Sequence, residues 1–176
     1  MHLLDLLVGK GVILQTHTPM TEISDSTNRD GYWVVQTERG SISAKTVVFA
    51  SNAYTSGILP QYKGKIVPCR GICSRITTPP GKHAPHLSNT YIIRSGEGIY
   101  DYLIRRPDGS IVVGGARQTF MSDLSQWYGN TDDTTLIEPA KNYFDGYMQK
   151  HFRGWEGSGA YTEGVWTGSK PNILSL

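Results

Sequence analysis

The sequence predicts an α/β fold, α+β in appearance, in which a few helices accompany mainly antiparallel strands. Between residues 20 and 44, short apolar runs alternate with polar turns, which is the pattern of an antiparallel meander. Val47–Ala53 is an apolar run of strand length that ends abruptly on small and polar residues. Residues 65–115 hold further β-rich runs, and 20 glycines and 9 prolines provide the many turns that such strands need.

The N-terminal third is expected to form one helix and a series of strands. Apolar residues over 2–9 predict a helix that Gly9 and Gly11 close. A hairpin turn at residues 38–40 joins two of the strands. The predicted strands cover residues 11–16, 20–24, 32–37 and 47–50, the last of them buried, and residues 41–44 lead into that last strand.

The rest of the chain is expected to form a sheet with one helix. Apolar and aromatic residues recur at helical spacing between Pro139, which suits a first helical turn, and Gly154, which ends the helix. Pro68 and Gly71 indicate an edge or a bulge in a long strand. The predicted strands cover residues 65–77, 90–93, 100–105, 110–115 and 159–168.

Composition argues against several classes of protein. Scattered charges, 17 basic and 15 acidic, give a net charge of +2, so no nucleic-acid partner is predicted. No apolar run reaches the length of a membrane span, and the start lacks the basic region of a signal peptide. Two cysteines, Cys69 and Cys73, are too few for a disulfide framework, so we expect a cytoplasmic protein. His83 and His86 have no carboxylate or thiol clustered with them, so no metal site is predicted.

The end of the run Val47–Ala53 is the first candidate site. In a doubly wound sheet, ligands lie just beyond the carboxyl ends of parallel strands, where the backbone approaches a phosphate closely. Ser51, Asn52 and Ala53 are small enough to allow that approach. The alternative interpretation is an ordinary core strand that runs into a turn.

Five short segments, taken in order, resemble those of one known family. They are Gly11–Leu14 with Thr18–Ile23, Ala50-Ser-Asn-Ala53, Pro68-Cys-Arg-Gly71, Gly109–Gly115 and Trp166-Thr-Gly168. On these segments, nearly the whole chain resembles the D-amino-acid-oxidase-like family of FAD-dependent oxidoreductases, which includes glycine oxidase and sarcosine oxidase-type enzymes. The resemblance implies hydride transfer from the carbon that bears the amine to flavin N5, after which water hydrolyses the imine.

The resemblance also implies roles in binding FAD. Met20 would contact the adenine through its backbone. The turn after Ala50 would lie near the FAD phosphates, with Asn52 in place of a glycine, because asparagine tolerates the left-handed backbone region. The candidate cofactor-binding residues are Met20, Ser51, Asn52, Ala53, Arg70, Gly71, Trp166 and Gly168.

Tyrosines and arginines are the candidates for binding the substrate, a small amine or amino acid. Alternation along a strand places Tyr100 and Tyr102 on one face, where they would meet an amine or a carboxylate. Tyr91 and Arg117 complete the candidate set, and no catalytic residue is assigned. The alternatives are half-buried strand aromatics and, for Arg70 and Arg117, arginines that brace a turn.

The sequence departs from the family pattern. It contains no Gly-x-Gly-x-x-Gly, the motif whose amides hold a pyrophosphate, and after Gly168 it lacks the family's Asp-x-x-Pro-x-x-Gly stretch. We therefore expect a fragment: a partial Rossmann-like FAD-binding domain over 1–67, a substrate-binding domain over 68–158 and a truncated return strand over 159–176.

The expected function is oxidation of the C–N bond of an amine or amino acid, with the chain inactive alone. One alternative is a non-catalytic remnant that binds no flavin and self-associates through unpaired sheet edges. The other is an unrelated α+β ligand-binding module.

Overall fold

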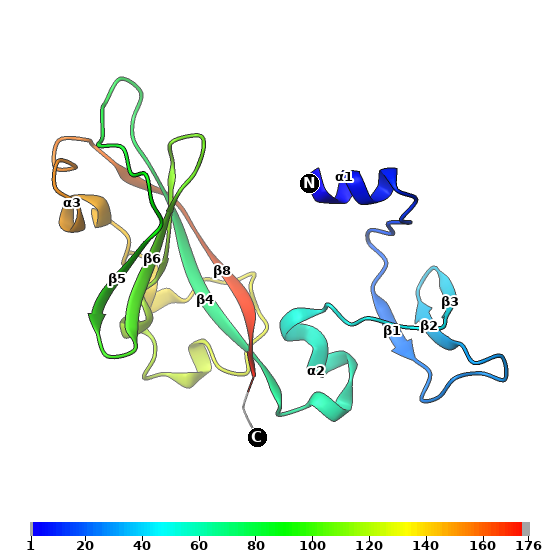
Figure 1. Ribbon diagram of the computed structural model, residues 1–176. Coiled ribbons are helices and arrows are strands. Elements are labelled where there is room, and N and C mark those ends of the chain that lie inside the picture. Colours follow the sequence, from blue (N-terminus) through cyan, green and yellow to red (C-terminus); the bar gives the residue numbers. More distant parts are fainter. Residues whose placement is uncertain (1, 174–176) are drawn as a thin grey trace. The chain divides into compact units, whose positions relative to one another are not determined.

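A computed structural model describes residues 2–173 of the chain. These residues form two compact units (Figure 1), of which unit 1 ends at Ala50 and unit 2 begins at Ser51. Residues 174–176 of the predicted return strand lie outside the described residues.

Unit 1 contains one helix and a small antiparallel sheet, as the sequence predicted. Its strands follow one another in the order β1-β2-β3, and the hairpin between β2 and β3 turns at Glu38 and Arg39. No side chain of residues 2–50 is buried. The elements are α1 (His2–Gly9), β1 (Met20–Ile23), β2 (Trp33–Thr37) and β3 (Gly40–Ala44).

Two predicted strands of unit 1 are wrong. Neither residues 11–16 nor residues 47–50 form a strand, and their apolar side chains are largely exposed: Ile13 and Val48 each expose 83%. A strand exists only where a neighbour takes its backbone hydrogen bonds, and no described strand pairs with either segment. The apolar pattern of these two segments therefore indicated side chains that could be buried, but it could not show whether a neighbouring strand would pair with them.

Unit 2 is a five-stranded antiparallel sheet with one face covered by helical turns. The strand order is β5-β6-β7-β4-β8. The strands are β4 (Ile66–Thr77), β5 (Tyr91–Gly96), β6 (Ile99–Arg105), β7 (Ile111–Gly115) and β8 (Tyr161–Ile173). The helices are the 3-10 turns η1 (Asn52–Tyr54), η2 (Pro60–Tyr62), η3 (Arg117–Thr119), η4 (Leu124–Gln126) and η5 (Glu138–Ala140), and the α-helices α2 (Thr55–Ile58) and α3 (Tyr147–His151).

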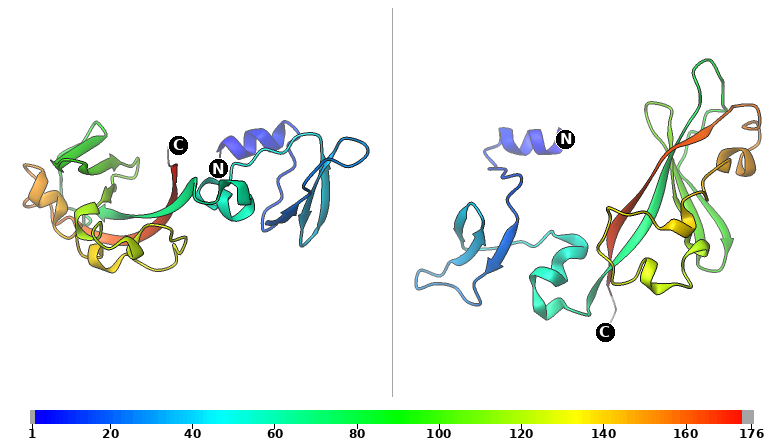
Figure 2. Two further views of the ribbon diagram at one scale, coloured as in Figure 1. Left: turned by 90° about the horizontal axis from the view of Figure 1, so that it is seen from below. Right: turned by 180° about the vertical axis from the view of Figure 1, so that it is seen from behind.

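The two neighbours of β4 differ in length. β8 pairs with β4 from Ile66 to Thr77, as the long side-by-side arrows of Figures 1 and 2 show, whereas β7 pairs only with Ile72–Ile76. A loop takes the place of β7 along the rest of β4. There the Arg70 amide donates to Trp127 O at 2.8 Å, and Pro68 O accepts from the Gly129 amide at 2.9 Å.

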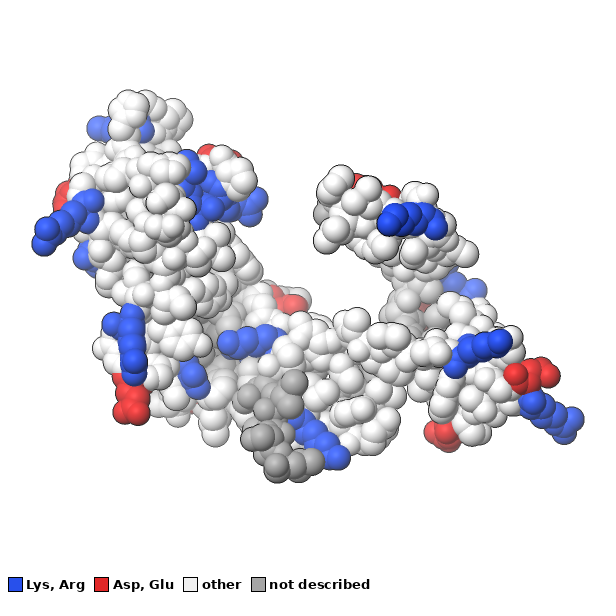
Figure 3. Space-filling view, in the orientation of Figure 1, with Lys and Arg blue, Asp and Glu red and all other residues white. Residues whose placement is uncertain are grey.

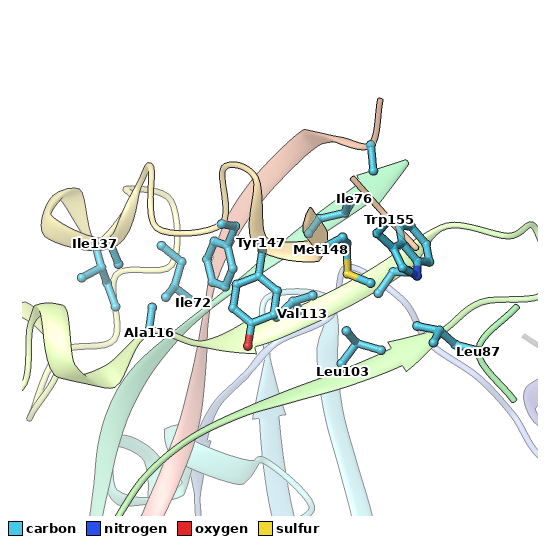
Figure 4. Close-up of a cluster of buried hydrophobic side chains, with 14 of the residues drawn as sticks. Ile72, Ile76, Leu87, Leu103, Val113, Ala116, Ile137, Tyr147, Met148 and Trp155 are labelled. Atoms are coloured by element: carbon cyan, nitrogen blue, oxygen red, sulfur yellow. The ribbon is translucent and has the colours of Figure 1, made fainter. Parts of the chain in front are cut away.

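The core of unit 2 lies between the sheet and the segment that precedes β8. Tyr147 and Met148 from α3 pack against Leu103 and Val113 of the sheet (Figure 4), and all four are almost fully buried. The predicted helix from Pro139 to Gly154 is only partly present. It is reduced to η5 and α3 because the intervening turn includes Gly146, whose φ of +68° is left-handed.

Both signs of charge occur on the surface of the described residues (Figure 3). On the face shown in Figure 3, lysines and arginines are dispersed over the viewed surface. Among residues 2–173, no helix is long and apolar enough to cross a membrane. No group of three or more His, Cys, Asp or Glu among them could hold a metal ion.

We predict that an isoleucine-to-alanine substitution is costly on one face of the sheet and nearly neutral on the other. Ile111→Ala removes a side chain that exposes 1% and should lower the free energy of unfolding by about 2–5 kcal/mol. Ile92→Ala, at a position that exposes 71%, should change it by no more than about 0.5 kcal/mol. Urea denaturation of both variants measures the difference, and equal losses would contradict the assignment of the core face.

Candidate functional site

A pocket opens in unit 2 where β7 ends beside the continuing β4. Its volume is about 280 Å³. Five residues predicted from the sequence line it: Arg70, Gly71, Tyr100, Tyr102 and Arg117. Cys69, Ile72, Gly115, Phe120, Trp127, Lys170 and Pro171 complete the lining.

The tyrosine wall of the pocket comes from β6. Tyr100 and Tyr102 alternate with the buried Asp101 and lie on the open face of the sheet. The ring of Tyr102 lies directly over Gly114 of β7, since a Cβ at that glycine would approach the ring to 2.3 Å. The Tyr102 hydroxyl is 3.2 Å from Cys73 Sγ, and burial, followed by this contact, raises the pKa of the phenol. The hydroxyl is therefore neutral at physiological pH.

Two cations lie at the other side of the pocket lining. The Arg117 guanidinium lies over the ring of Trp127, with 5.6 Å from Cζ to the ring centroid. Trp127 is itself held by a hydrogen bond from its Nε1 to Met121 O at 3.3 Å. Lys170 comes from β8, where it is paired with Cys69. No acidic residue is among the residues that line the pocket.

Arg70 is a third cation of the lining, and it is buried with only 6% exposed. Its guanidinium donates to Thr135 O, to Thr135 Oγ1 at 3.2 Å and to Gln126 O at 3.4 Å. Its Nε has no partner, and no carboxylate among the described residues forms an ion pair with it. A buried cation favours an anion nearby, and the Asp132 carboxylate is one, since Arg70 contributes to lowering its pKa.

The loop that holds Arg70 is organised by Asp132. Its carboxylate accepts from the Thr134 amide at 2.9 Å and from the Thr134 and Thr135 hydroxyls at 2.6 Å each. These bonds lower the pKa of Asp132 to about 2, and the bonds from the two hydroxyls have the largest effect. The next residue, Asp133, accepts a longer bond from Tyr54 of η1 at 3.4 Å.

A buried carboxylate lies behind the tyrosine wall. Asp101 exposes 4% and accepts three hydrogen bonds. The donors are the Ala116 amide at 2.9 Å, the Tyr143 hydroxyl at 2.6 Å and the Tyr147 hydroxyl at 2.8 Å. Burial, and then the bond to Asp101, raises the pKa of Tyr143 to about 12 and that of Tyr147 further, so both phenols are donors at neutral pH.

The other predicted site residues lie outside this pocket lining. Tyr91 packs against the core, with its ring edge-on to Phe152 at 5.5 Å. Trp166 is paired with Cys73 and exposes 44%, while Gly168 is paired with Gly71. Met20 begins β1 of unit 1.

The predicted phosphate turn is present as η1 and the residue before it. Asn52 has a φ of +53°, the left-handed conformation expected of a residue that replaces glycine. Ala53 is buried, and the Ser51 hydroxyl is 2.9 Å from that of Thr55. In unit 2, η1 lies against β4 and β8.

Three important residues were not predicted from the sequence. Lys170 was accessible to the alternation argument, because it follows Trp166 and Gly168 at strand spacing. Asp101 could also have been found from alternation, because an acidic residue between two outward-facing tyrosines faces the core and needs buried hydrogen-bond donors. Trp127 gave no signal, because it lies in a loop whose path depends on the unpaired edge of β4.

The chain belongs to the family of FAD-dependent oxidoreductases. The model of that family, described as "FAD dependent oxidoreductase", matches residues 1–174. No match was found among the curated proteins.

Solved structures share the fold. Glycine oxidase from Geobacillus kaustophilus is similar with a TM-score of 0.65 and 20% identity, over 94% of this chain and 39% of that one. Glycine oxidase from Bacillus cereus has a TM-score of 0.57 and 14% identity, over 88% of this chain and 38% of that one. The flavin-dependent halogenase CmlS has a TM-score of 0.60 and 16% identity, over 95% of this chain and 30% of that one. The chain thus spans about two fifths of the glycine oxidases, and the likeness confirms the α/β fold class.

Of two elements that commonly contribute to a dinucleotide site, the described residues contain one. The left-handed Asn52 provides a turn of the kind that approaches a phosphate. No glycine-rich strand-turn-helix is present among residues 2–173, and α2 has only four residues. The pocket of unit 2, in contrast, is lined by described residues of that unit.

We predict that Asp132→Asn reveals the pH dependence of the loop that holds Arg70. A lowered pKa means that the stabilisation is present above the ordinary value of 3.8 and is lost as the pH falls to about 2. The variant should unfold at a lower temperature than the wild type at about pH 6, and the gap should close at about pH 2. Thermal unfolding followed by circular dichroism measures it.

Asp133→Asn is the matched control, because that carboxylate accepts a single bond at 3.4 Å. Its effect should be small at both pH values. A gap for Asp132→Asn that stays constant with pH would contradict the prediction.

Proposed function

We propose that the chain contributes the substrate-binding part of an FAD-dependent oxidoreductase that oxidises the C–N bond of an amine or amino acid. In this proposal, residues 1–67 are a partial FAD-binding domain, residues 68–158 bind the substrate and residues 159–176 return toward the flavin. The enzyme acts in the cytoplasm, and these residues alone are inactive.

The observation that carries the proposal is the charge of the pocket. Arg117 and Lys170 line it, the buried Arg70 lies in the same lining without a carboxylate partner, and no acid is among the lining residues. Such a pocket attracts an anion of small-molecule size. In a chain of this family, the carboxylate of an amino acid is the anion that fits best.

The remaining residues of the pocket suit an amine. Nearby cations disfavour the protonated form of an amine, and only the neutral amine releases a hydride from its carbon. The neutral Tyr102 hydroxyl offers a hydrogen-bond partner without adding a charge. Tyr100, Phe120 and Trp127 provide aromatic walls for the rest of the ligand. The flavin, when bound, supplies the acceptor of the hydride.

One observation favours the second candidate, a non-catalytic domain that associates with itself. β5 and β8 are the edges of the larger sheet, and β1 and β3 are those of the smaller. Unpaired strand edges offer backbone groups to another chain. Self-association through these edges remains a proposal that accompanies the first.

We predict that the pocket binds a carboxylate through Arg117. Titration calorimetry of the chain with phenylacetate should show binding, and the uncharged isostere phenylacetamide should bind far more weakly. Arg117→Met should raise the Kd on the order of 10–100-fold, because a hydrogen bond to a charged group contributes about 1.5–3 kcal/mol.

Arg94→Met is the matched control, since Arg94 is exposed on β5 and donates only to Gly96 O at 3.1 Å. It should leave the Kd unchanged. Equal affinity for phenylacetate and phenylacetamide would contradict an anion site.

We predict that the purified chain is colourless. The absorbance between roughly 350 and 500 nm would reveal a bound flavin, and we expect none before or after addition of FAD. A chain that takes up FAD, and whose colour bleaches on addition of an amino acid, would show that these residues suffice for the reaction. A colourless chain that still binds phenylacetate supports the substrate-binding role.

A further inference from the structure

We propose that Asp101 is a positioning residue for the pocket: its buried carboxylate holds the turn after β7, so that Arg117 faces the ligand. The inference rests on the proposed function, because Arg117 is taken there as the carboxylate-binding cation. It concerns a residue that does not itself line the pocket.

The turn that Asp101 holds is conformationally unfavourable without support. Gly115 has a φ of +140°, and Ala116 has a φ of +56°, a left-handed conformation that costs energy for a residue with a side chain. Asp101 Oδ1 accepts the Ala116 amide at 2.9 Å, which fixes this peptide in place. The side chain of Arg117 leaves the backbone at the next residue.

The approach of the carboxylate to the turn is close and depends on glycine. A Cβ at residue 115 would lie 2.1 Å from Asp101 Oδ1 and 2.9 Å from its Cα. Only glycine lets the two strands bring the carboxylate under the turn at this distance. β6 and the end of β7 are therefore fitted to each other at this point.

The carboxylate is fixed from the opposite side by the core. Asp101 Oδ2 accepts from the Tyr143 and Tyr147 hydroxyls at 2.6 and 2.8 Å. Tyr147 exposes 1%, and Figure 4 shows its ring reaching from the segment of α3 toward the sheet. Tyr143 also accepts from Gln118 Nε2 at 2.6 Å, so η3 is tied to the same group. The carboxylate thus joins α3, β6 and η3.

The same carboxylate positions the tyrosine wall. Tyr100 and Tyr102 flank Asp101 on β6 and point to the opposite face, into the pocket lining. Arg117, whose guanidinium lies over the ring of Trp127, belongs to the same lining. One buried group therefore sets the spacing of the cation and the tyrosines, although it touches no ligand.

The test compares the position of Arg117 with the binding of phenylacetate in four proteins. In the wild type, the ring of Trp127 should shift the NMR signals of the Arg117 Nε–H and Cδ protons. Asp101→Asn keeps an oxygen for the Ala116 amide and should retain both the shift and the Kd. Asp101→Ala should lose the shift and weaken binding by about tenfold or more, as displaced binding groups do.

Ile76→Ala controls for stability, because Ile76 is buried in the same core at the far end of the β4–β7 pairing. It should lower the unfolding temperature but leave the Arg117 signals and the Kd unchanged. Should Asp101→Ala fail to fold, Asp101→Leu combined with Tyr143→Phe and Tyr147→Phe removes the buried polar cluster together. The Ala116 amide then loses its acceptor, whereas the exposed Gln118, which loses Tyr143, can donate to water. That variant should show the same loss of shift and of affinity.

Three outcomes separate the inferences. A folded Asp101→Ala or triple variant with wild-type Arg117 signals and Kd would overturn the positioning role of Asp101 and leave the proposed function standing. A wild type that does not bind phenylacetate would overturn the proposed ligand, while the Arg117 signals would still decide the positioning role. A loss of affinity in Ile76→Ala equal to that in Asp101→Ala would also overturn it, since stability alone would then explain the effect.

Discussion

The architecture of unit 2 depends on β4, whose two neighbours differ in length. β8 pairs with all of β4, but β7 leaves it at Ile72. Backbone groups left unpaired inside a protein are costly, so the loop that carries Trp127 pairs with Pro68 and Arg70 in the place of β7. The pocket is the space between the strand that ends and the loop that replaces it. The difference in length between β4 and β7 thus provides both the pocket and the place of Trp127 in its lining.

The two buried charges near the pocket, Asp101 and Arg70, are each held by neutral groups. Asp101 takes N–H and O–H donors, and Arg70 takes carbonyl and hydroxyl acceptors. Neither is neutralised by an ion pair among the described residues. Asp101 lies behind the tyrosines, whereas Arg70 belongs to the lining itself. The lining therefore holds three basic residues and no acidic one, although the chain carries a net charge of only +2.

Strand alternation and short motifs selected several residues that line this pocket, although Arg70 and Gly71 were predicted to bind FAD. Alternation placed Tyr100 and Tyr102 on one face, and the resemblance selected Arg70, Gly71 and Arg117, which the fold brings to the same pocket. The prediction failed where a segment's structure depends on another part of the chain that packs against it or pairs with it. Residues 47–50 have the composition of a buried strand but no described partner strand. Trp127 reaches the pocket only because β7 is shorter than β4.

The distribution of these features along the chain separates binding from redox chemistry. Every residue that lines the pocket lies between Cys69 and Pro171, and these include all the charges and aromatic rings that would orient a ligand. The turn at Asn52, in contrast, is proposed as one piece of a dinucleotide site, and no glycine-rich strand-turn-helix is among residues 2–173. A site for a small anion needs only converging side chains, whereas a pyrophosphate needs several backbone amides from a strand-turn-helix. In the proposed function, binding of the ligand would therefore be separable from acceptance of its hydride, and unit 2 would provide the residues for the first.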